Sequence, residues 1–161
     1  MGLKTYKKET ESPVPPKRLF KAFCLDSHKL FPKLLPQAFE SVEFVEGDHT
    51  AVGCIKQVNF PAGHEYKYAK HRIDALDEAN FYIKDTTIEG DVLGDKLEYI
   101  VNEAKYEVSS SGGSVCKLTT SFHTKGDAVL EEDKVEMGFE KMHKLFKAVE
   151  EYLIANPQAY A

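Results

Sequence analysis

The chain has 161 residues, of which 42% are hydrophobic and 29% charged, and this predicts a single globular domain over residues 1–161. Its 21 Lys and Arg against 26 Asp and Glu give a net charge of −5, which argues against a nucleic-acid partner. No segment approaches the roughly 18 consecutive apolar residues of a membrane span, which argues against a membrane partner. The 10 Phe and 8 Tyr are too many rings to leave in water, so we expect most to be buried.

The three cysteines, Cys24, Cys54 and Cys116, lie far apart in the chain and are odd in number. They show neither the pairwise spacing of metal ligands nor a disulfide framework. The N-terminal residues lack the apolar core of a signal peptide. We therefore expect reduced thiols, a cytoplasmic location, no bound metal and no other cofactor.

The first third of the chain predicts one strand and two short helices. Residues 3–11 alternate, and the prolines that follow end the strand. Pro15 and Pro16 are suited to a helix start, and residues 18–23 carry apolar side chains at helical spacing. Asp26 and Ser27 can cap a second helix, which Pro36 would end.

From residue 40 to residue 123 the apolar residues recur with a period of two, and turn residues interrupt them at short intervals. This pattern predicts an antiparallel meander, because no helical segment separates the strands. The expected strands cover residues 42–46, 54–60, 66–77, 81–88, 97–108 and 115–122.

The last segment predicts one long amphipathic helix that starts at the acidic residues 131–133 and ends at Asn156-Pro157. Its apolar stripe consists of Val135, Gly138, Met142, Leu145, Phe146, Val149 and Leu153. Only this helix is large enough to cover the apolar face of the sheet, so we expect an α+β fold with space for a ligand between them.

Ordered matches over the whole chain carry a resemblance to the plant pathogenesis-related class 10 proteins, the family of the major birch-pollen allergen. They include residues 15–23, Glu46-Gly47-Asp48, residues 88–98, residues 111–114, residues 123–127 and residues 148–153. The resemblance implies a helix-grip fold, in which a seven-stranded antiparallel sheet wraps around the C-terminal helix, two short helices form a V, and a large internal cavity binds ligands.

The loop after Glu46 departs from the glycine-rich loop of that family. Residues 46–54 form a longer segment, and His49, Thr50 and Val52 occupy its centre. A phosphate cradle needs backbone conformations that glycine adopts readily and these residues do not. We therefore interpret the segment as a stiffened hairpin loop.

Asp85 is the most unusual residue of the expected cavity wall, because most relatives carry Tyr at this position. It shares a strand face with Phe81, Ile83 and Thr87. A carboxylate there could anchor an amine or hydroxyl group of a ligand, or it could be a solvated acid near the rim, or the strand register could differ by one residue. The resemblance also places His71 toward the cavity, where it could bind a ligand, with Asp85 raising its proton affinity, or play a structural role. His28, between the short helices, is either a gate residue or exposed.

The rest of the ligand-binding wall follows from the pattern and the resemblance together. Each apolar member could equally be ordinary core packing. The expected set is Phe23, His28, Phe31, Phe39, Phe60, Tyr66, Tyr68, His71, Ile83, Asp85, Ile100, Asn102, Leu118, Thr120, Met137, Gly138 and Met142.

Lys56, Glu98, Glu150 and Tyr152 match residues proposed as a ribonuclease site in the family. Two carboxylates and a lysine can supply acid, base and charge stabilisation, but the acidic chain lacks a basic groove for RNA. Some relatives condense amines with carbonyls through a Lys. Lys117 should point outward here, because it alternates with apolar residues.

The sequence therefore predicts an intracellular carrier for small amphipathic or aromatic metabolites and hormones such as cytokinins, flavonoids, steroids or abscisic-acid-like ligands, in defence or stress. An enzyme, either a weak ribonuclease or a small-molecule synthase or isomerase, is the alternative. The resemblance implies a monomer or weak homodimer whose partner is a small hydrophobic or amphipathic ligand.

Overall fold

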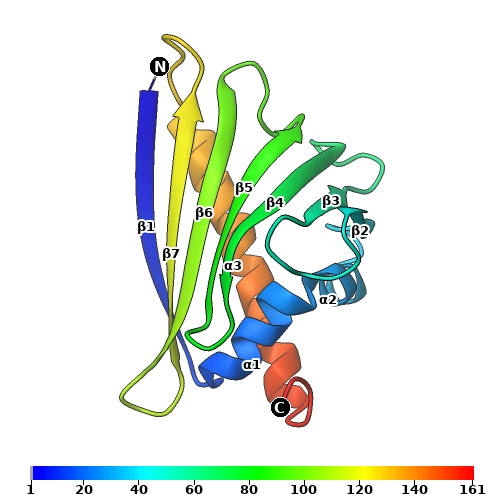
Figure 1. Ribbon diagram of the computed structural model, residues 1–161, viewed down its shortest axis with the longest axis vertical. Coiled ribbons are helices and arrows are strands. Elements are labelled where there is room, and N and C mark those ends of the chain that lie inside the picture. Colours follow the sequence, from blue (N-terminus) through cyan, green and yellow to red (C-terminus); the bar gives the residue numbers. More distant parts are fainter. Residues whose placement is uncertain (1) are drawn as a thin grey trace.

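The computed structural model describes residues 2–161 and shows a curved seven-stranded antiparallel sheet with a long C-terminal helix on its concave side (Figure 1). The strand order β1-β7-β6-β5-β4-β3-β2 confirms the predicted meander, with the first strand added beside the last. The predicted α+β helix-grip fold is confirmed. The strands are β1 (Gly2–Ser12), β2 (Ser41–Glu46), β3 (Ile55–Asn59), β4 (Tyr68–Asp77), β5 (Tyr82–Gly90), β6 (Leu97–Val108) and β7 (Ser114–Thr124).

The helical segments are α1 (Pro16–Phe20), η1 (Lys21–Leu25), α2 (Ser27–Leu34) and α3 (Glu132–Ala155). The first expected helix is present, but its second half, η1, widens into a π-helical turn. Helix α2 starts where predicted, yet the expected cap at Asp26 is wrong, because its side chain makes no capping hydrogen bond. The Asp26 carboxylate instead accepts a hydrogen bond from the Tyr160 hydroxyl. This bond ties the V formed by α1, η1 and α2, here called the helical V, to the C-terminus.

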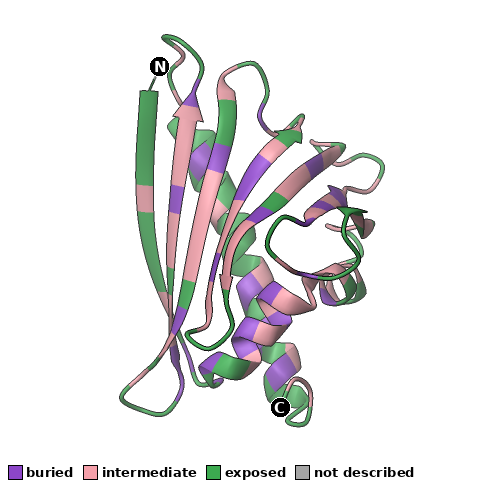
Figure 2. Cartoon of the chain, viewed as in Figure 1, coloured by how far each residue is buried: buried purple, intermediate pink, exposed green. Residues whose placement is uncertain are grey.

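Helix α3 is buried at Val135 and in its second half, not along the whole predicted stripe (Figure 2). Val135, Phe146 and Leu153 are buried, whereas Gly138 and Met142 in the middle of the helix are exposed. The side chains of the middle turns face open space rather than sheet side chains, so the apolar residues there remain exposed. Neither α3 nor any other helix within residues 2–161 is both long and apolar enough to cross a membrane.

The solid part of the core lies where α1 and η1 pack against the last turns of α3. Leu19, Phe20, Val149 and Leu153 are at most 1% exposed. The Phe20 ring lies 6.2 Å from Tyr106 of β6 and 5.8 Å from Phe81, which joins the helices to the sheet. This dry cluster closes one end of the molecule and leaves the space farther along α3 unfilled.

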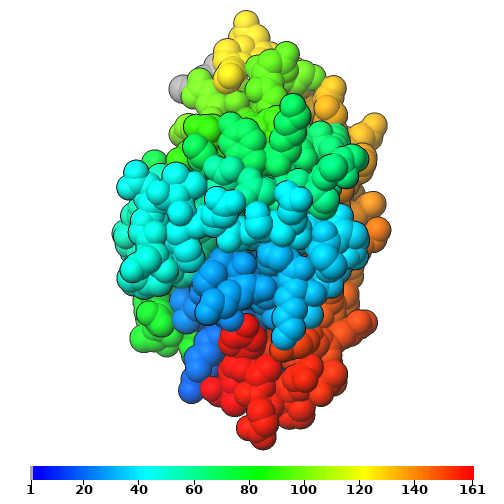
Figure 3. Space-filling model, turned by 90° about the vertical axis from the view of Figure 1, so that its right-hand side faces the viewer, coloured from blue at the N-terminus to red at the C-terminus, as the bar shows by residue number. Residues whose placement is uncertain are grey.

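Arg18 fastens α1 to the end of α3. Its Nε donates to the Ala159 carbonyl at 3.0 Å, and its Nη2 donates to the carbonyls of Leu153 and Asn156, each at 2.8 Å. The last carbonyls of a helix have no partner within the helix, and a cation at this end also favours the helix dipole. The C-terminal residues consequently lie against the helical V, as the red and blue segments of Figure 3 show.

Replacing Arg18 by Lys is expected to lower the free energy of unfolding by about 1–2 kcal/mol, because an ammonium cannot reach three carbonyls held by a planar guanidinium. For a domain of this size the melting temperature should fall by about 2–8 °C in a circular-dichroism melt. Lys17→Met, at the exposed neighbouring position, is the control and should change little. Equal melting temperatures for both variants would show that the Arg18 contacts contribute no stability.

The loop between β2 and β3 is a stiffened hairpin connection. Gly47 and Gly53, at its two ends, take φ values of 84° and 90°, which glycine adopts most readily. Within residues 2–161, the only non-glycine residues with positive φ lie outside this loop. The Thr50 hydroxyl donates to the Leu25 carbonyl at 3.1 Å and holds the loop against η1. The central residues thus serve packing between loop and helix.

Candidate functional site: an internal cavity with a polar row

A cavity of about 1140 Å³ lies between the concave face of the sheet, the helical V and α3. Its wall is mainly apolar and aromatic, which suits the burial of ligand rings. The apolar and aromatic residues of the wall are Phe23, Phe31, Phe39, Val42, Val58, Ile73, Ile83, Ala104, Tyr106, Leu118, Phe139, Met142, Leu145 and Phe146.

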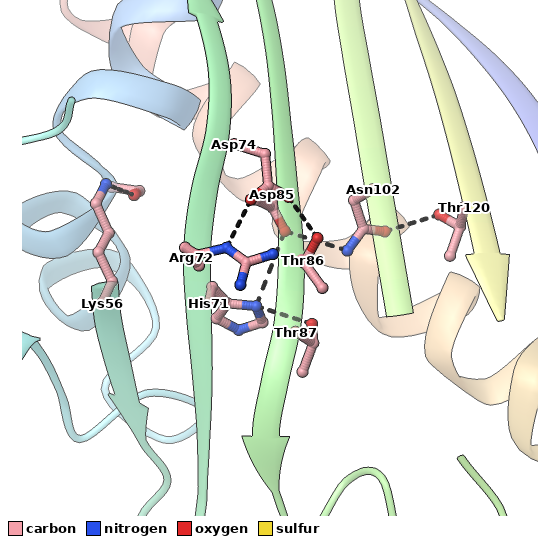
Figure 4. A network of polar contacts seen from close by, with 10 residues as sticks. Lys56, His71, Arg72, Asp74, Asp85, Thr86, Thr87, Asn102 and Thr120 are labelled. Carbon is pink, nitrogen blue, oxygen red and sulfur yellow. Dashed lines mark hydrogen bonds and ion pairs between the residues drawn. The ribbon is translucent and has the colours of Figure 1, made fainter. Parts of the chain in front are cut away.

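A row of polar side chains crosses the sheet at the cavity wall (Figure 4). Lys56 of β3 is the register partner of His71 of β4, and Asp85 of β5 is the partner of Asn102 of β6. The Asn102 amide donates to Asp85 at 3.4 Å and accepts from the Thr120 hydroxyl of β7 at 2.9 Å. Adjacent strands therefore present one continuous polar row inside an otherwise apolar cavity.

Asp85 and His71 form the centre of this polar row. The His71 Nδ1 lies 3.9 Å from an Asp85 carboxylate oxygen and 2.9 Å from the Thr87 hydroxyl. Burial raises the pKa of Asp85, and the nearby His71 opposes that shift. Asp85 raises the pKa of His71, as expected, but burial lowers that pKa by more, so the net shift is downward. The exposed part of Asp85 faces the cavity, where a ligand group can reach it.

Lys56 lies at the β3 end of the polar row and is only 6% exposed to solvent. Its Nζ lies 3.4 Å from the Cys24 carbonyl and 3.4 Å from the Ser27 hydroxyl, and 5.6 Å from the centre of the Phe44 ring. Burial lowers the pKa of this ammonium. The amine is consequently held by neutral groups at the cavity wall.

His28 lies outside the wall and packs against Phe44, with ring centres 4.8 Å apart. Its side chain is 18% exposed, so the expectation of a freely exposed residue is wrong. Its Nδ1 is buried and has no hydrogen-bond partner within residues 2–161. Burial and the charge of Lys56 lower the pKa of His28, which keeps the ring neutral between the helical V and the sheet.

A second aromatic group lies beyond the cavity rather than in its wall. Phe60 stacks on His64 at 4.5 Å and lies 6.5 Å from Tyr66. Tyr68 turns its hydroxyl to Glu89 at 2.8 Å. These rings lie at the ends of β3 and β4 and in the loop between them, where Lys141 of α3 pairs with Glu65 at 3.6 Å and lies 5.8 Å from the centre of the Tyr66 ring.

The structure places the expected ligand-binding residues in two groups. Those that line the cavity are Phe23, Phe31, Phe39, His71, Ile83, Asp85, Asn102, Leu118 and Met142. Those that do not line it are His28, Phe60, Tyr66, Tyr68, Ile100, Thr120, Met137 and Gly138. In the second group, Thr120 supports Asn102 from behind, and Met137 and Gly138 lie on the exposed side of α3.

The residues of the proposed ribonuclease site are dispersed. Lys56 faces the cavity, Glu98 is exposed on β6, and Glu150 is buried on α3 beside Lys147 at 3.3 Å. Tyr152 accepts a hydrogen bond from Lys33 at 3.2 Å. Within residues 2–161 no hydrogen bond or ion pair joins two of these four residues.

Lys117 is exposed and pairs with Glu107 at 3.2 Å, which confirms its outward orientation.

Sequence reasoning missed several wall residues that the strand alternation could have identified. Ile73 has the same parity as His71, and Ala104 and Tyr106 have the same parity as Asn102. Tyr106 interacts with the thiols of Cys24 and Cys116, whose pKa values are raised by burial. These thiols are therefore packing groups rather than nucleophiles.

The sequence analysis also did not predict that β1 and α3 line the cavity where they face each other. No local sequence signal identifies residues that meet across an open cavity. Residues 8–11 of β1 line it, together with a polar face of α3. The Lys8 ammonium lies 5.0 Å from the centre of the Phe139 ring, and Lys4 and Tyr6 both bind Glu132 at the start of α3.

Across residues 2–161, no cluster of three His, Cys, Asp or Glu side chains could hold a metal ion.

Comparison with known proteins gives consistent matches over the whole chain. Residues 1–156 match the Pathogenesis-related protein Bet v 1 family. The major strawberry allergen Fra a 1.08 from Fragaria ananassa is 49% identical over 160 residues, covering 99% of both chains. Pathogenesis-related protein STH-2 from Solanum tuberosum is 48% identical, covering 100% of both chains.

Solved structures show the same fold. That of Ara h 8.0201 superposes with a TM-score of 0.86 at 39% identity and covers 96% of this chain and 100% of that one. Norcoclaurine synthase from Thalictrum flavum, in complex with dopamine and hydroxybenzaldehyde, has a TM-score of 0.77 at 22% identity, covering 96% of this chain and 88% of that one. The second likeness concerns the fold alone.

Proposed function

The chain belongs to the Pathogenesis-related protein Bet v 1 family, and we propose that it binds and carries small amphipathic aromatic molecules in its internal cavity. The observation that carries the proposal is the cavity of about 1140 Å³, apolar over most of its wall and crossed by one polar row. Protein cores are normally packed without voids of this size, so the open volume itself favours an occupant. Ligands of this kind include plant metabolites and hormones met in defence and stress.

Affinity and orientation would come from different parts of the wall. Burying ligand rings against Phe23, Phe31 and Phe146 contributes about 25 cal/mol per Å² of apolar surface. Asp85 and Asn102 offer an acceptor and an amide to one polar end of the ligand, since a few placed polar groups fix orientation in apolar pockets. We further propose that the protein acts in the cytoplasm as a monomer or weak homodimer.

Filling the cavity tests this proposal directly. Ala104→Phe places a ring in the wall, and it should weaken binding of anilinonaphthalene sulfonate at least about tenfold, because the ring takes the volume and apolar surface that the probe needs. Lys105→Phe, one residue along β6 and exposed on the opposite face, is the matched control and should leave the dissociation constant unchanged. Fluorescence titration measures both. Similar binding by both variants would place the probe outside the cavity and contradict the proposal.

A further inference from the structure

Lys56 is unusual among the lysines of this chain. It is the only buried one of the 19 lysines in the sequence. The cavity wall includes three other lysines, Lys8, Lys144 and Lys147, and all three are exposed at the border between β1 and α3. Lys56 instead projects from β3 into the depth of the wall, beside Cys24 and Ser27.

Within residues 2–161 the Lys56 amine forms no direct ion pair, although the charges of Asp85 and Asp26 partly oppose the effect of burial. Within residues 2–161 no acidic oxygen lies within 4.0 Å of its Nζ, and its two hydrogen bonds, both 3.4 Å long, go to a carbonyl and a hydroxyl oxygen. Burial without an ion pair favours the neutral form of an amine, and burial indeed lowers the pKa of Lys56. A neutral amine in an apolar pocket is a nucleophile toward carbonyl carbon.

Two side chains that can transfer protons, His71 and Asp85, line the same cavity from the neighbouring strands β4 and β5. His71 is its direct register partner on β4, and side chains so paired have Cβ atoms about 5 Å apart. Asp85 lies 3.9 Å from His71, and burial shifts both groups toward their neutral forms. A neutral imidazole can accept a proton and pass it on, and the nearby Asp85 carboxylate stabilises the protonated ring while it does so.

We propose that Lys56 captures carbonyl ligands, chiefly aromatic aldehydes, as a reversible imine inside the cavity, an inference that rests on the proposed binding function. The Nζ lone pair forms a bond to the carbonyl carbon, and the carbonyl π electrons move to oxygen, which takes up a proton. The carbinolamine then expels this oxygen as water while nitrogen loses its remaining proton, leaving a C=N bond. The aldehyde and amine thus yield imine and one water, with no oxidant or reductant. His71 and Asp85 would relay the protons.

Reductive trapping with vanillin tests the proposal. Cyanoborohydride delivers hydride to the imine carbon, so a trapped lysine gains the mass of vanillin less one oxygen atom. Intact mass and peptide mapping of the wild-type protein should show one label at Lys56. It should form at least about tenfold faster than at Lys144 or Lys147 in the same molecules, because the cavity holds the reactants together. Lys56→Arg, which keeps a cation but lacks a nucleophilic amine, should lose this label.

Vanillyl alcohol, which has the same ring but no carbonyl, separates the two proposals. If the alcohol binds by calorimetry and the aldehyde labels Lys56 no faster than the exposed lysines, imine capture is wrong and the binding function stands. If neither compound binds or labels Lys56, both proposals fail for this class of ligand. The internal comparison among lysines of the wild-type protein does not depend on the folding of any variant.

Discussion

Replacing Asp85 by Asn is expected to weaken binding of naphthylethylamine by about ten- to a hundredfold while leaving propylnaphthalene nearly unchanged. Asp85 is an unpaired carboxylate at the cavity wall, with only the Asn102 amide and the more distant His71 beside it. A hydrogen bond to a charged group contributes about 1.5–3 kcal/mol, whereas a ring and alkyl chain contact the same apolar wall in both proteins. Isothermal calorimetry on the two ligands measures the difference.

The pH dependence of this selectivity follows from the raised pKa of Asp85. As the pH falls through that raised value, the carboxylate is protonated and the preference of the wild-type protein for the amine should fade. Asp95→Asn is the matched control, because Asp95 is an exposed aspartate outside the cavity wall, whereas the charge of Asp74 contributes to the raised pKa of Asp85. Equal losses for amine and hydrocarbon in Asp85→Asn would mean that Asp85 does not orient the ligand.

Replacing Lys56 by Met should stabilise the protein by about 1–2 kcal/mol at neutral pH, since a lysine that lacks a direct ion pair is costly to bury and Met has similar length without charge. This corresponds to a rise in melting temperature of about 2–8 °C for a domain of this size. Lys56→Met should therefore gain stability and lose imine capture. This combination is typical of a residue that serves function and lowers the stability of the fold.

The pH dependence of that gain has a definite sign. The pKa of Lys56 is lowered from its ordinary value of 10.5, so between the lowered pKa and 10.5 the unfolded chain binds the proton and the folded chain does not. Wild-type stability therefore rises with pH across this window. The advantage of Lys56→Met should be largest below the window and vanish near 10.5. Lys105→Met, at an exposed position, should show no such trend; urea unfolding at several pH values decides between the two behaviours.

Local patterns determined most of the architecture. The period-two segment from residue 40 onward identified the meander, and β6 spans the predicted residues 97–108, because alternation and turn residues are local signals. The acidic start and Asn156-Pro157 end likewise bounded α3. The same alternation placed Ile83 and Asp85 on one face of β5, the resemblance implied that this face points into the cavity, and both residues line it. The family and its seven-stranded helix-grip fold were also identified from ordered sequence matches.

What the sequence alone could not decide depends on distances between segments remote in the chain. Gly138 and Met142 of α3 were both expected in the ligand-binding wall, but only Met142 lines the cavity, whereas Gly138 lies on the exposed side of the helix. Tertiary burial also lowered the proton affinity of His71 despite its acidic neighbour, since desolvation outweighs one charge nearly 4 Å away. The composition required many rings to be buried, and the resemblance predicted that they surround a cavity; only the packed structure decided which of them line it and that Lys56 faces it.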